Sequence, residues 1–477
     1  MRFKPLTSFV IALSILLTIL TGKVLLAQGI VTVQVDNRPP GISTRYIGAV
    51  EGNLNFDIKD LQDLGINTYR IYGGMSRWEA EDDDQVYGWP SITEIKANPN
   101  IINWTWWDTV MTNPPNSSDY WWSGKLGTTW QGNARTIFST LKQANIKPIL
   151  TIRNTDNSWN PSWALQLNPP RTAEDWNEWW EHVFATVYWL NVRNDYQVND
   201  FQIHNEPDNR EQGWGGTQAD YFELVRVTKD AIDYVYKTYL PGRSYHIHAP
   251  VTVGESLWPL KVLQAIPTSF DSIDIHDYSS DIADYTQRVR SWMKATRHAE
   301  SPIWLSEWGS YQNEYNSISF AINLIQNAIR ASQAGNSYIY GSHVFSLYDW
   351  GRESQFEGLI GVEGKRRASY YALRMSIRAL QGGRPTFSVS TNNPNLMAIA
   401  TKDLADKFYL LVTNSGKESY TVNANLSTHM MIGTGTVWEF SSQVMDEVVG
   451  DLKLNQGHVS LKIPSKTAML LQFKAKD

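Results

Sequence analysis

Two glutamates in short motifs are the residues of this chain best suited to do chemistry. Glu206 lies in the run His-Asn-Glu-Pro, and Glu307 lies in the run Leu-Ser-Glu-Trp-Gly. Two carboxyl groups about 5 to 5.5 Å apart can hydrolyse a glycoside with retention, one as proton donor and the other as nucleophile. A separation of about 6.5 to 9.5 Å fits inversion instead. Short motifs recur by chance, so the elements that carry them decide whether the two glutamates can meet.

One pattern repeats from Tyr46 to about Leu380: a short apolar strand-like run, then a loop, then a longer segment of helical period. Eight strands are expected, at 46–51, 67–72, 148–153, 200–205, 245–250, 272–276, 302–307 and 339–347. Such a repeat predicts an α/β fold, a (β/α)8 TIM barrel, with a doubly wound open sheet as the competing arrangement. Glu206 follows the fourth strand and Glu307 ends the seventh. Active sites of such barrels lie at the carboxyl ends of the strands, so the two side chains can face each other across the axis.

At this point the residues resemble glycoside hydrolase clan A, the retaining (β/α)8-barrel β-glycosidases. The resemblance rests on Asn205-Glu206-Pro207 after strand four and Glu307-Trp308-Gly309 after strand seven, 101 residues later. It implies that Glu206 is the acid/base and Glu307 the nucleophile. It covers the barrel and extends to families with an accessory β-domain, such as family 39 and family 30. Strand three ends in Arg153-Asn154-Thr155, where family 5 enzymes often carry a histidine, so family 5 is disfavoured.

The same resemblance assigns further roles. It implies that Asn205 bonds the sugar 2-hydroxyl, that His276 orients the ligand, that Tyr278 holds the nucleophile, and that Trp350 forms the aromatic floor of the subsite where the bond breaks. For Asn205, such a bond strengthens in the transition state. As an alternative, His276 is a core histidine whose hydrogen bonds are satisfied.

Arg70, late in strand two, is a further candidate site residue, because its positive charge can keep Glu307 ionised. The structural alternative for this residue is a plain buried ion pair. Three more candidates for substrate binding are Asn154, Trp159 and Trp214, with packing as the alternative for the tryptophans.

Composition narrows the class of ligand. The chain has 21 Trp and 23 Tyr, more aromatic surface than a core uses, and the segment 73–131 alone holds eight of the tryptophans. Such a surplus suits a ligand bound by stacking. The net charge is −6, without a basic stripe, which argues against nucleic acid as a partner. There is no cysteine, so disulfides and thiolate metal sites are excluded.

Composition also divides the chain. Residues 1–27 have the positive start, apolar stretch and small-residue end of a signal peptide, with an uncleaved anchor as the alternative. The mature protein is expected to be secreted or periplasmic, without a membrane contact. Residues 28–44 contain an alternating strand, Ile30 to Val35, expected to join a C-terminal domain. The barrel is expected at 45–381 and an antiparallel β-sandwich at 385–477.

The prediction is a secreted enzyme that cleaves β-linked poly- or oligosaccharides through a glycosyl-enzyme. It needs no metal or organic cofactor, and a monomer is expected. The acidic run Glu79 to Asp84 is interpreted as a solvated loop rather than a calcium site. Two alternatives stay open: an inactive barrel that binds carbohydrate, and a transglycosylase. The sugar, its linkage and endo or exo action are not fixed by the sequence.

Overall fold

The computed structural model describes residues 30–35, 41–52, 56–78, 90–112, 134–153, 168–210, 213–279, 281–310, 314–333, 339–349, 357–426 and 434–474. Several sequence predictions lie outside these residues: the signal peptide, the acidic run Glu79 to Asp84, and the side chains of Asn154, Trp159 and Trp350. Within the described residues, no helix combines the length and apolar character needed to cross a membrane.

Eight parallel strands close into a barrel in the order β10-β3-β4-β5-β6-β7-β8-β9. Their bounds are β3 (Tyr46–Val50), β4 (Thr68–Gly74), β5 (Lys147–Arg153), β6 (Asp200–Ile203), β7 (His246–Thr252), β8 (Ser272–His276), β9 (Ile303–Gly309) and β10 (Ile339–Phe345). These are the eight predicted strands, each shifted by a few residues at most. The predicted (β/α)8 barrel is therefore confirmed, and the open sheet was the wrong alternative.

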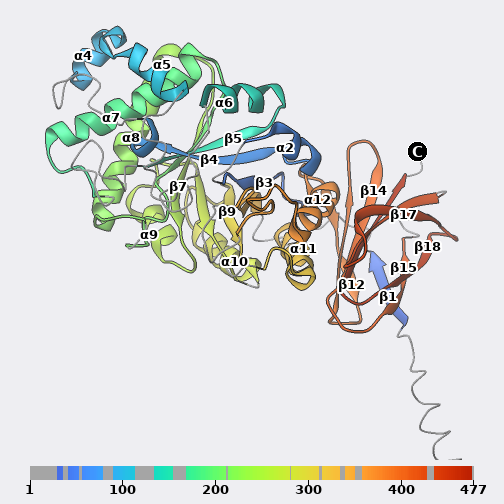
Figure 1. Cartoon of the computed structure of the whole chain (residues 1–477). Coiled ribbons are helices and arrows are strands. Elements are labelled where there is room, and N and C mark those ends of the chain that lie inside the picture. The colour runs from blue at the N-terminus through green and yellow to red at the C-terminus, as the bar shows by residue number, and fades with distance from the viewer. Residues whose placement is uncertain are drawn as a thin grey trace, which may run out of the picture.

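Helices surround the barrel (Figure 1). The described helices are α2 (Ile58–Leu64), α3 (Met75–Trp78), α4 (Ile92–Ala97), η1 (Pro99–Ile101), α5 (Trp104–Thr112), α6 (Ala134–Gln143), α7 (Ala173–Tyr188), η3 (Trp189–Arg193), α8 (Gln218–Tyr239), α9 (Trp258–Ala265), α10 (Ile282–Met293), α11 (Ile318–Gln333) and α12 (Ala368–Leu380). Local chemistry explains where the two long helices before and after β6 begin. Thr172 and Asp175 form a capping box at α7, and Thr217 and Asp220 form one at α8.

The tryptophans of the long segment between β4 and β5 are core residues wherever the structure describes them. Trp78, Trp104 and Trp107 are buried, and Trp106 packs against the same core. These indoles hold the helices α3 and α5 against the barrel instead of lining a cleft.

The C-terminal domain is a sandwich of two sheets. One has the order β17-β16-β19-β14-β13-β11-β2 and the other the order β12-β1-β15-β18. Their bounds are β1 (Ile30–Val35), β2 (Gly41–Ile42), β11 (Pro385–Phe387), β12 (Val389–Thr391), β13 (Leu396–Lys402), β14 (Lys407–Asn414), β15 (Tyr420–Asn425), β16 (Thr434–Phe440), β17 (Met445–Lys453), β18 (His458–Ile463) and β19 (Thr467–Lys474). β1 pairs antiparallel with β12 and parallel with β15, so the N-terminal strand lies among C-terminal strands in Figure 1. The sandwich thus contains one parallel pair.

Alternation along β14 explains how the domains stack. Successive side chains of a strand point to opposite faces. Phe408 and Leu410 belong to the core between the two sheets, whereas Tyr409 and Leu411 belong to the core shared with the barrel. The seven-stranded sheet therefore packs on the barrel helices α11 and α12 with one face and on the four-stranded sheet with the other.

Candidate active site

Glu206 and Glu307 lie at the carboxyl end of the barrel, just after β6 and within β9. β6 ends at Ile203, because the backbone turns there. His204 has φ 64° and Glu206 has φ 46°, a left-handed conformation that residues other than glycine seldom adopt and that is enriched at functional sites. Burial lowers the pKa of His204 to about 3, with a smaller effect from Arg153, so this imidazole is neutral near pH 7.

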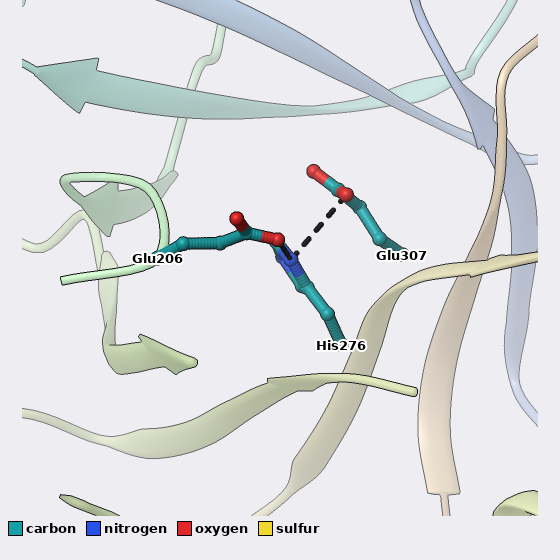
Figure 2. Close-up of side chains that lie close together, drawn as sticks. All are labelled: Glu206, His276 and Glu307. Carbon is teal, nitrogen blue, oxygen red and sulfur yellow. Dashed lines mark hydrogen bonds and ion pairs between the residues drawn. The ribbon is translucent and has the colours of Figure 1, made fainter. Parts of the chain in front are cut away.

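The His276 side chain joins the two carboxyl groups (Figure 2). Its Nδ1 is 2.8 Å from Oε1 of Glu206 and 3.3 Å from Oε2 of Glu307. The nitrogen and one oxygen of each glutamate all lie within 4.8 Å of one another. A nitrogen between two carboxylate oxygens has to donate, which places the imidazole proton on Nδ1. These carboxylate oxygens thus lie closer together than the about 6.5–9.5 Å that separates the carboxyl groups of inverting glycosidases.

Glu307 is surrounded by donors. Its Oε1 accepts from Arg70 and, at 2.6 Å, from the Tyr72 hydroxyl. Its Oε2 accepts from the Tyr278 hydroxyl at 2.8 Å. Burial by itself raises the pKa of this carboxyl, but the charges of His276 and Arg70 and the two tyrosine hydrogen bonds outweigh it, so the pKa lies below its usual range. Glu307 is held as a carboxylate.

Arg70 is fully buried and oriented by a second set of contacts. It donates to Asn205 Oδ1 at 2.6 Å, to the Tyr72 hydroxyl at 3.0 Å and to Gln202 Oε1 at 2.5 Å. Burial opposes its charge, yet the neighbouring Tyr72 and Glu307 raise its pKa above the usual value. The guanidinium is therefore a permanent cation next to Glu307.

Gln202 links Arg70 to the interior of the barrel. Its Oε1 also accepts from Thr151 at 2.6 Å, and its Nε2 donates to Asp274. The amide can satisfy all three partners in one orientation only, with the oxygen toward Arg70. Asp274 thereby holds Gln202, and Gln202 holds Arg70.

Glu206 has a different environment. Besides His276, it accepts from Asn209 Nδ2 at 3.2 Å. No lysine or arginine of the described residues forms an ion pair with it. Its loop is tightly packed: Asn209 N–H donates to the Glu206 carbonyl at 2.9 Å, and a Cβ added at Gly213 would lie 1.7 Å from that oxygen. The two carboxyl groups therefore differ in their partners: Arg70 and two tyrosine hydroxyls contact Glu307, whereas Asn209 and His276 contact Glu206.

The predicted site residues divide into three groups. Arg70, Asn205, His276 and Tyr278 converge with the two glutamates, as described above. Asn154, Trp159 and Trp350 lie outside the described residues. Trp214 does not reach the site.

The prediction that Trp214 binds substrate is wrong for this structure. Its side chain is 0% exposed, lies edge-on to His204 at 5.0 Å between ring centroids, and donates its indole N–H to the Thr217 carbonyl. No face of the indole is left for a sugar. Its role is to support the turn that carries Glu206.

Four contacts were not predicted: Tyr72, Gln202, Asn209 and Asp274. A signal existed for two of them, since Tyr72 is two residues after Arg70 and Asp274 two before His276 on their strands. Alternate residues of a barrel strand share a face, so this spacing would have placed each of them inward with its neighbour.

Glu206, His276 and Glu307 also have the types and spacing of metal ligands. However, both oxygens of Glu307 already accept from protein donors, and Arg70 supplies the positive charge. A metal ion would have to displace the Nδ1 proton of His276 and compete with that guanidinium. The donor set fits a self-contained pair of carboxyl groups better than a metal centre.

Comparison with known proteins gives one sequence relative. No protein-family model matches the chain. A β-xylosidase of Caldicellulosiruptor saccharolyticus is 23% identical over 270 residues, which are 50% of this chain and 52% of that protein. The chain thus spans about half the length of the curated relative that it matches.

Solved structures share the fold over almost the whole chain. A glucosidase from Croceicoccus marinus has a TM-score of 0.66 at 13% identity and covers 94% of this chain and 100% of its own. A GH39 β-xylosidase from Caulobacter crescentus has a TM-score of 0.63 at 16% identity and covers 93% of this chain and 99% of its own. A GH30 endoxylanase from Clostridium papyrosolvens has a TM-score of 0.61 at 12% identity and covers 94% of this chain and 100% of its own. The predicted resemblance to barrel glycosidases with an accessory β-domain, families 39 and 30 among them, is confirmed at the level of the fold.

Proposed function

We propose that this chain is a retaining β-glycosidase in which Glu307 is the nucleophile and Glu206 the acid/base. One observation carries the proposal: oxygens of the two glutamates lie within 4.8 Å of each other, with the Nδ1 of His276 within the same distance. That spacing supports direct attack by one carboxylate and not attack by an intervening water. The glycosidase relative and the shared fold support the same reaction class.

In the first step Glu307 attacks the anomeric carbon while Glu206 protonates the glycosidic oxygen. The carbon–oxygen bond to the leaving group breaks, a carbon–oxygen bond to Glu307 forms, and the leaving group departs as an alcohol. The contacts support this division of roles. Glu307 is held ionised by Arg70, Tyr72 and Tyr278, as a nucleophile must be.

In the second step water attacks the same carbon, and Glu206 removes its proton. Glu307 leaves as a carboxylate, and its donors stabilise the returning charge. His276 contacts both carboxyl groups, so its Nδ1 proton can follow the negative charge from Glu206 to Glu307 and back. Two inversions at one carbon give net retention.

For the substrate we propose a β-linked xyloside unit within an oligo- or polysaccharide. The support is the name of the sequence relative, a β-xylosidase, and of the GH39 and GH30 neighbours. Aryl β-glycosides of xylose, glucose, galactose and mannose test the sugar on purified protein. The highest kcat/KM is expected for the xyloside, and a clear preference for another sugar refutes this part alone.

Substitution of the nucleophile tests the mechanism. Glu307→Ala is expected to lose about 10⁴-fold or more in kcat. Added azide, which fits the space left by the carboxylate, is expected to restore turnover and to give a glycosyl azide of inverted configuration. Glu223→Gln is the matched control, because Glu223 is an exposed carboxyl on α8 whose partner is Arg226.

Product stereochemistry separates the alternatives. Early NMR spectra are expected to show the β-anomer, and an α-anomer as first product contradicts retention. A wild-type protein that binds glycans but cleaves none is the inactive barrel. Oligosaccharides longer than the substrate, formed at high acceptor concentration, reveal transglycosylation through the same intermediate.

We also propose that residues 1–27 direct export and are then removed. Their composition supports this, with a positive start and a long apolar stretch. Expression of the full chain in a bacterial host, followed by N-terminal sequencing of the extracytoplasmic protein, is expected to start at Gln28. A full-length protein that stays with the membrane fraction contradicts cleavage.

A further inference from the structure

A cavity of about 390 Å³ lies beside the nucleophile, between the end of β9 and helix α11. Its size falls in the range of small-molecule sites. Its principal lining side chains are Tyr278, Trp308, Glu314, Phe320, Asn323 and Asn327. We call it the α11 cavity.

The α11 cavity adjoins the catalytic pair without containing it. Tyr278 lines the cavity and also donates to Glu307 at 2.8 Å. Glu206, which has to reach the glycosidic oxygen, is not part of the lining. The cavity thus shares Tyr278 with the surroundings of Glu307 and does not include Glu206.

The lining has the chemistry of a carbohydrate site. Asn323 is exposed on α11 and Asn327 lies one turn further, so two amides accompany the aromatic rings. The Trp308 indole N–H is buried and has no acceptor among the described residues. An acceptor on a ligand or a water molecule can satisfy such a donor. Sugars present hydroxyl groups at their edge and C–H groups on their faces, which match amides and rings respectively.

Charge decides which sugars fit. Among the described lining residues Glu314 is the charged group, and the Ser310 hydroxyl donates to its Oε2 at 2.9 Å. No lysine or arginine is among the described residues that line the cavity, so within this lining a uronic acid or a phosphate would meet a carboxylate without a compensating cation. For a neutral sugar unit, by contrast, the Glu314 carboxylate is an acceptor for the hydroxyl groups.

We propose that the α11 cavity binds a neutral sugar unit of the substrate, adjacent to the unit that Glu307 attacks. The proposal rests on the proposed glycosidase function and deepens it. It makes the chain an enzyme for oligosaccharides with at least one undecorated neighbouring unit, and it places the discrimination against acidic decoration in Glu314.

The first test uses Asn323→Ala, because Asn323 is exposed and its removal leaves the core intact. The measured quantity is the ratio of kcat/KM for neutral β-1,4-xylotetraose to kcat/KM for aryl β-xyloside. Loss of one hydrogen bond to a sugar is expected to lower this ratio about three- to tenfold. Ser319→Ala, an exposed change on the same helix outside the cavity, is expected to leave the ratio unchanged. A wild-type ratio in Asn323→Ala overturns the proposal.

The second test measures binding without turnover. In a Glu206→Gln background, titration calorimetry with neutral xylotetraose is expected to show weaker binding when Asn323→Ala is added. Glu314→Gln is expected to improve binding of a xylo-oligosaccharide that carries a glucuronic acid, relative to the neutral one. If neither affinity moves, the α11 cavity is not a sugar site.

These outcomes also separate the two proposals. A wild-type protein that cleaves no β-glycoside, but binds neutral oligosaccharide through Asn323, refutes the glycosidase and keeps the subsite. An active enzyme whose oligosaccharide preference ignores Asn323 and Glu314 keeps the glycosidase and refutes the subsite.

Discussion

The Tyr278 hydroxyl donates to Glu307, the proposed nucleophile, and its removal gives the sharpest prediction. Tyr278→Phe deletes the 2.8 Å hydrogen bond to Oε2 of Glu307 and leaves Arg70 and Tyr72 on Oε1. In the first step Glu307 loses its negative charge, and in the second step it regains it. A donor to this oxygen therefore favours the second step, in which the carboxylate leaves. We predict that Tyr278→Phe slows hydrolysis of the glycosyl-enzyme.

The size of the effect follows from the bond that is lost. A hydrogen bond to a charged group contributes about 1.5–3 kcal/mol, and each 1.36 kcal/mol is a factor of ten in rate. The charge on Glu307 is only partly restored in the transition state, so the lower half of this range applies. The second step is expected to slow about 10- to 40-fold.

Rapid-mixing kinetics with a dinitrophenyl β-glycoside measure this step, because a good leaving group makes the first step fast. Tyr278→Phe is expected to show a burst of about one equivalent of phenol, a lower kcat, a lower KM, and a glycosyl-enzyme visible by intact mass spectrometry. Loss of a donor also raises the pKa of Glu307, so the acidic limb of kcat/KM moves to higher pH. The control is Tyr285→Phe, whose hydroxyl bonds the Ser256 backbone. An unchanged kcat, with no burst and an unmoved acidic limb, would refute the reasoning.

Other predictions concern the supports of the site and the fold. Gly213→Ala is expected to lower kcat at least tenfold with an unchanged circular dichroism spectrum, because the new Cβ collides with the Glu206 carbonyl; full activity contradicts this packing. Asp274→Ala removes the acceptor that holds the Gln202 amide, which in turn orients Arg70, and is expected to lower kcat about tenfold and to move the acidic limb of the pH profile to higher pH. Asp274→Asn keeps an acceptor and is expected to have a milder effect. Equal pH profiles for both variants exclude a positioning role. Asp446→Ala is expected to lower the free energy of unfolding by about 1–3 kcal/mol, since this buried carboxylate on β17 pairs with two partly exposed arginines of α12. Thermal or urea unfolding measures it, and an unchanged midpoint shows that these ion pairs do not contribute to stability.

A pH prediction follows from Glu307. Its folded pKa is depressed, so its contribution to stability is present above the unfolded pKa and is lost as the pH falls through the folded pKa. The difference in unfolding free energy between wild type and Glu307→Gln is therefore expected to shrink on acidification. Urea unfolding of both proteins from pH 7 downward measures it, and a difference that is constant over the whole range contradicts an ionised native Glu307.

The barrel could be predicted from the sequence because its signals are local. Each strand is a short apolar run, each helix has its own period, and eight repeats of the unit close in one way. Strand order then placed Glu206 and Glu307 at the same end of the barrel. The predicted fourth strand extends two residues beyond the end of β6, because the apolar pattern of the sequence does not reveal the left-handed turn at His204.

The contacts between strands could not be predicted in the same way. Arg70, Gln202 and Asp274 come from the second, fourth and sixth strands, and their hydrogen bonds depend on how far each side chain reaches across the barrel. Trp214 was misjudged for a related reason. An indole near a catalytic motif can face the ligand or support the turn, and only the folded loop shows which.

The interior of the barrel shows why the position of the nucleophile is so well determined. Many barrels fill this space with branched apolar side chains, but here charged and polar residues cross it. Lys147 contacts Asp200 at 2.5 Å, and His248 lies 3.2 Å from the same carboxylate and 3.7 Å from Asp274, which holds the Gln202 amide under Arg70.

Among the described residues, Arg70 pairs with Glu307 and Lys147 with Asp200 in this interior, and a buried charge without its partner costs several kcal/mol. Replacing or moving one of these charged side chains alone is therefore unfavourable. Asp274 and Gln202 hold the Arg70 guanidinium in place, and the guanidinium holds Glu307. The positions of Arg70 and Glu307 are thus set by the core of the barrel, whose strands can be counted in the sequence, whereas the lining of the proposed sugar site on α11 cannot be derived from the strand count. Substitutions in the interior are accordingly expected to change kcat for every substrate alike, and substitutions in the α11 cavity to change the ranking of substrates.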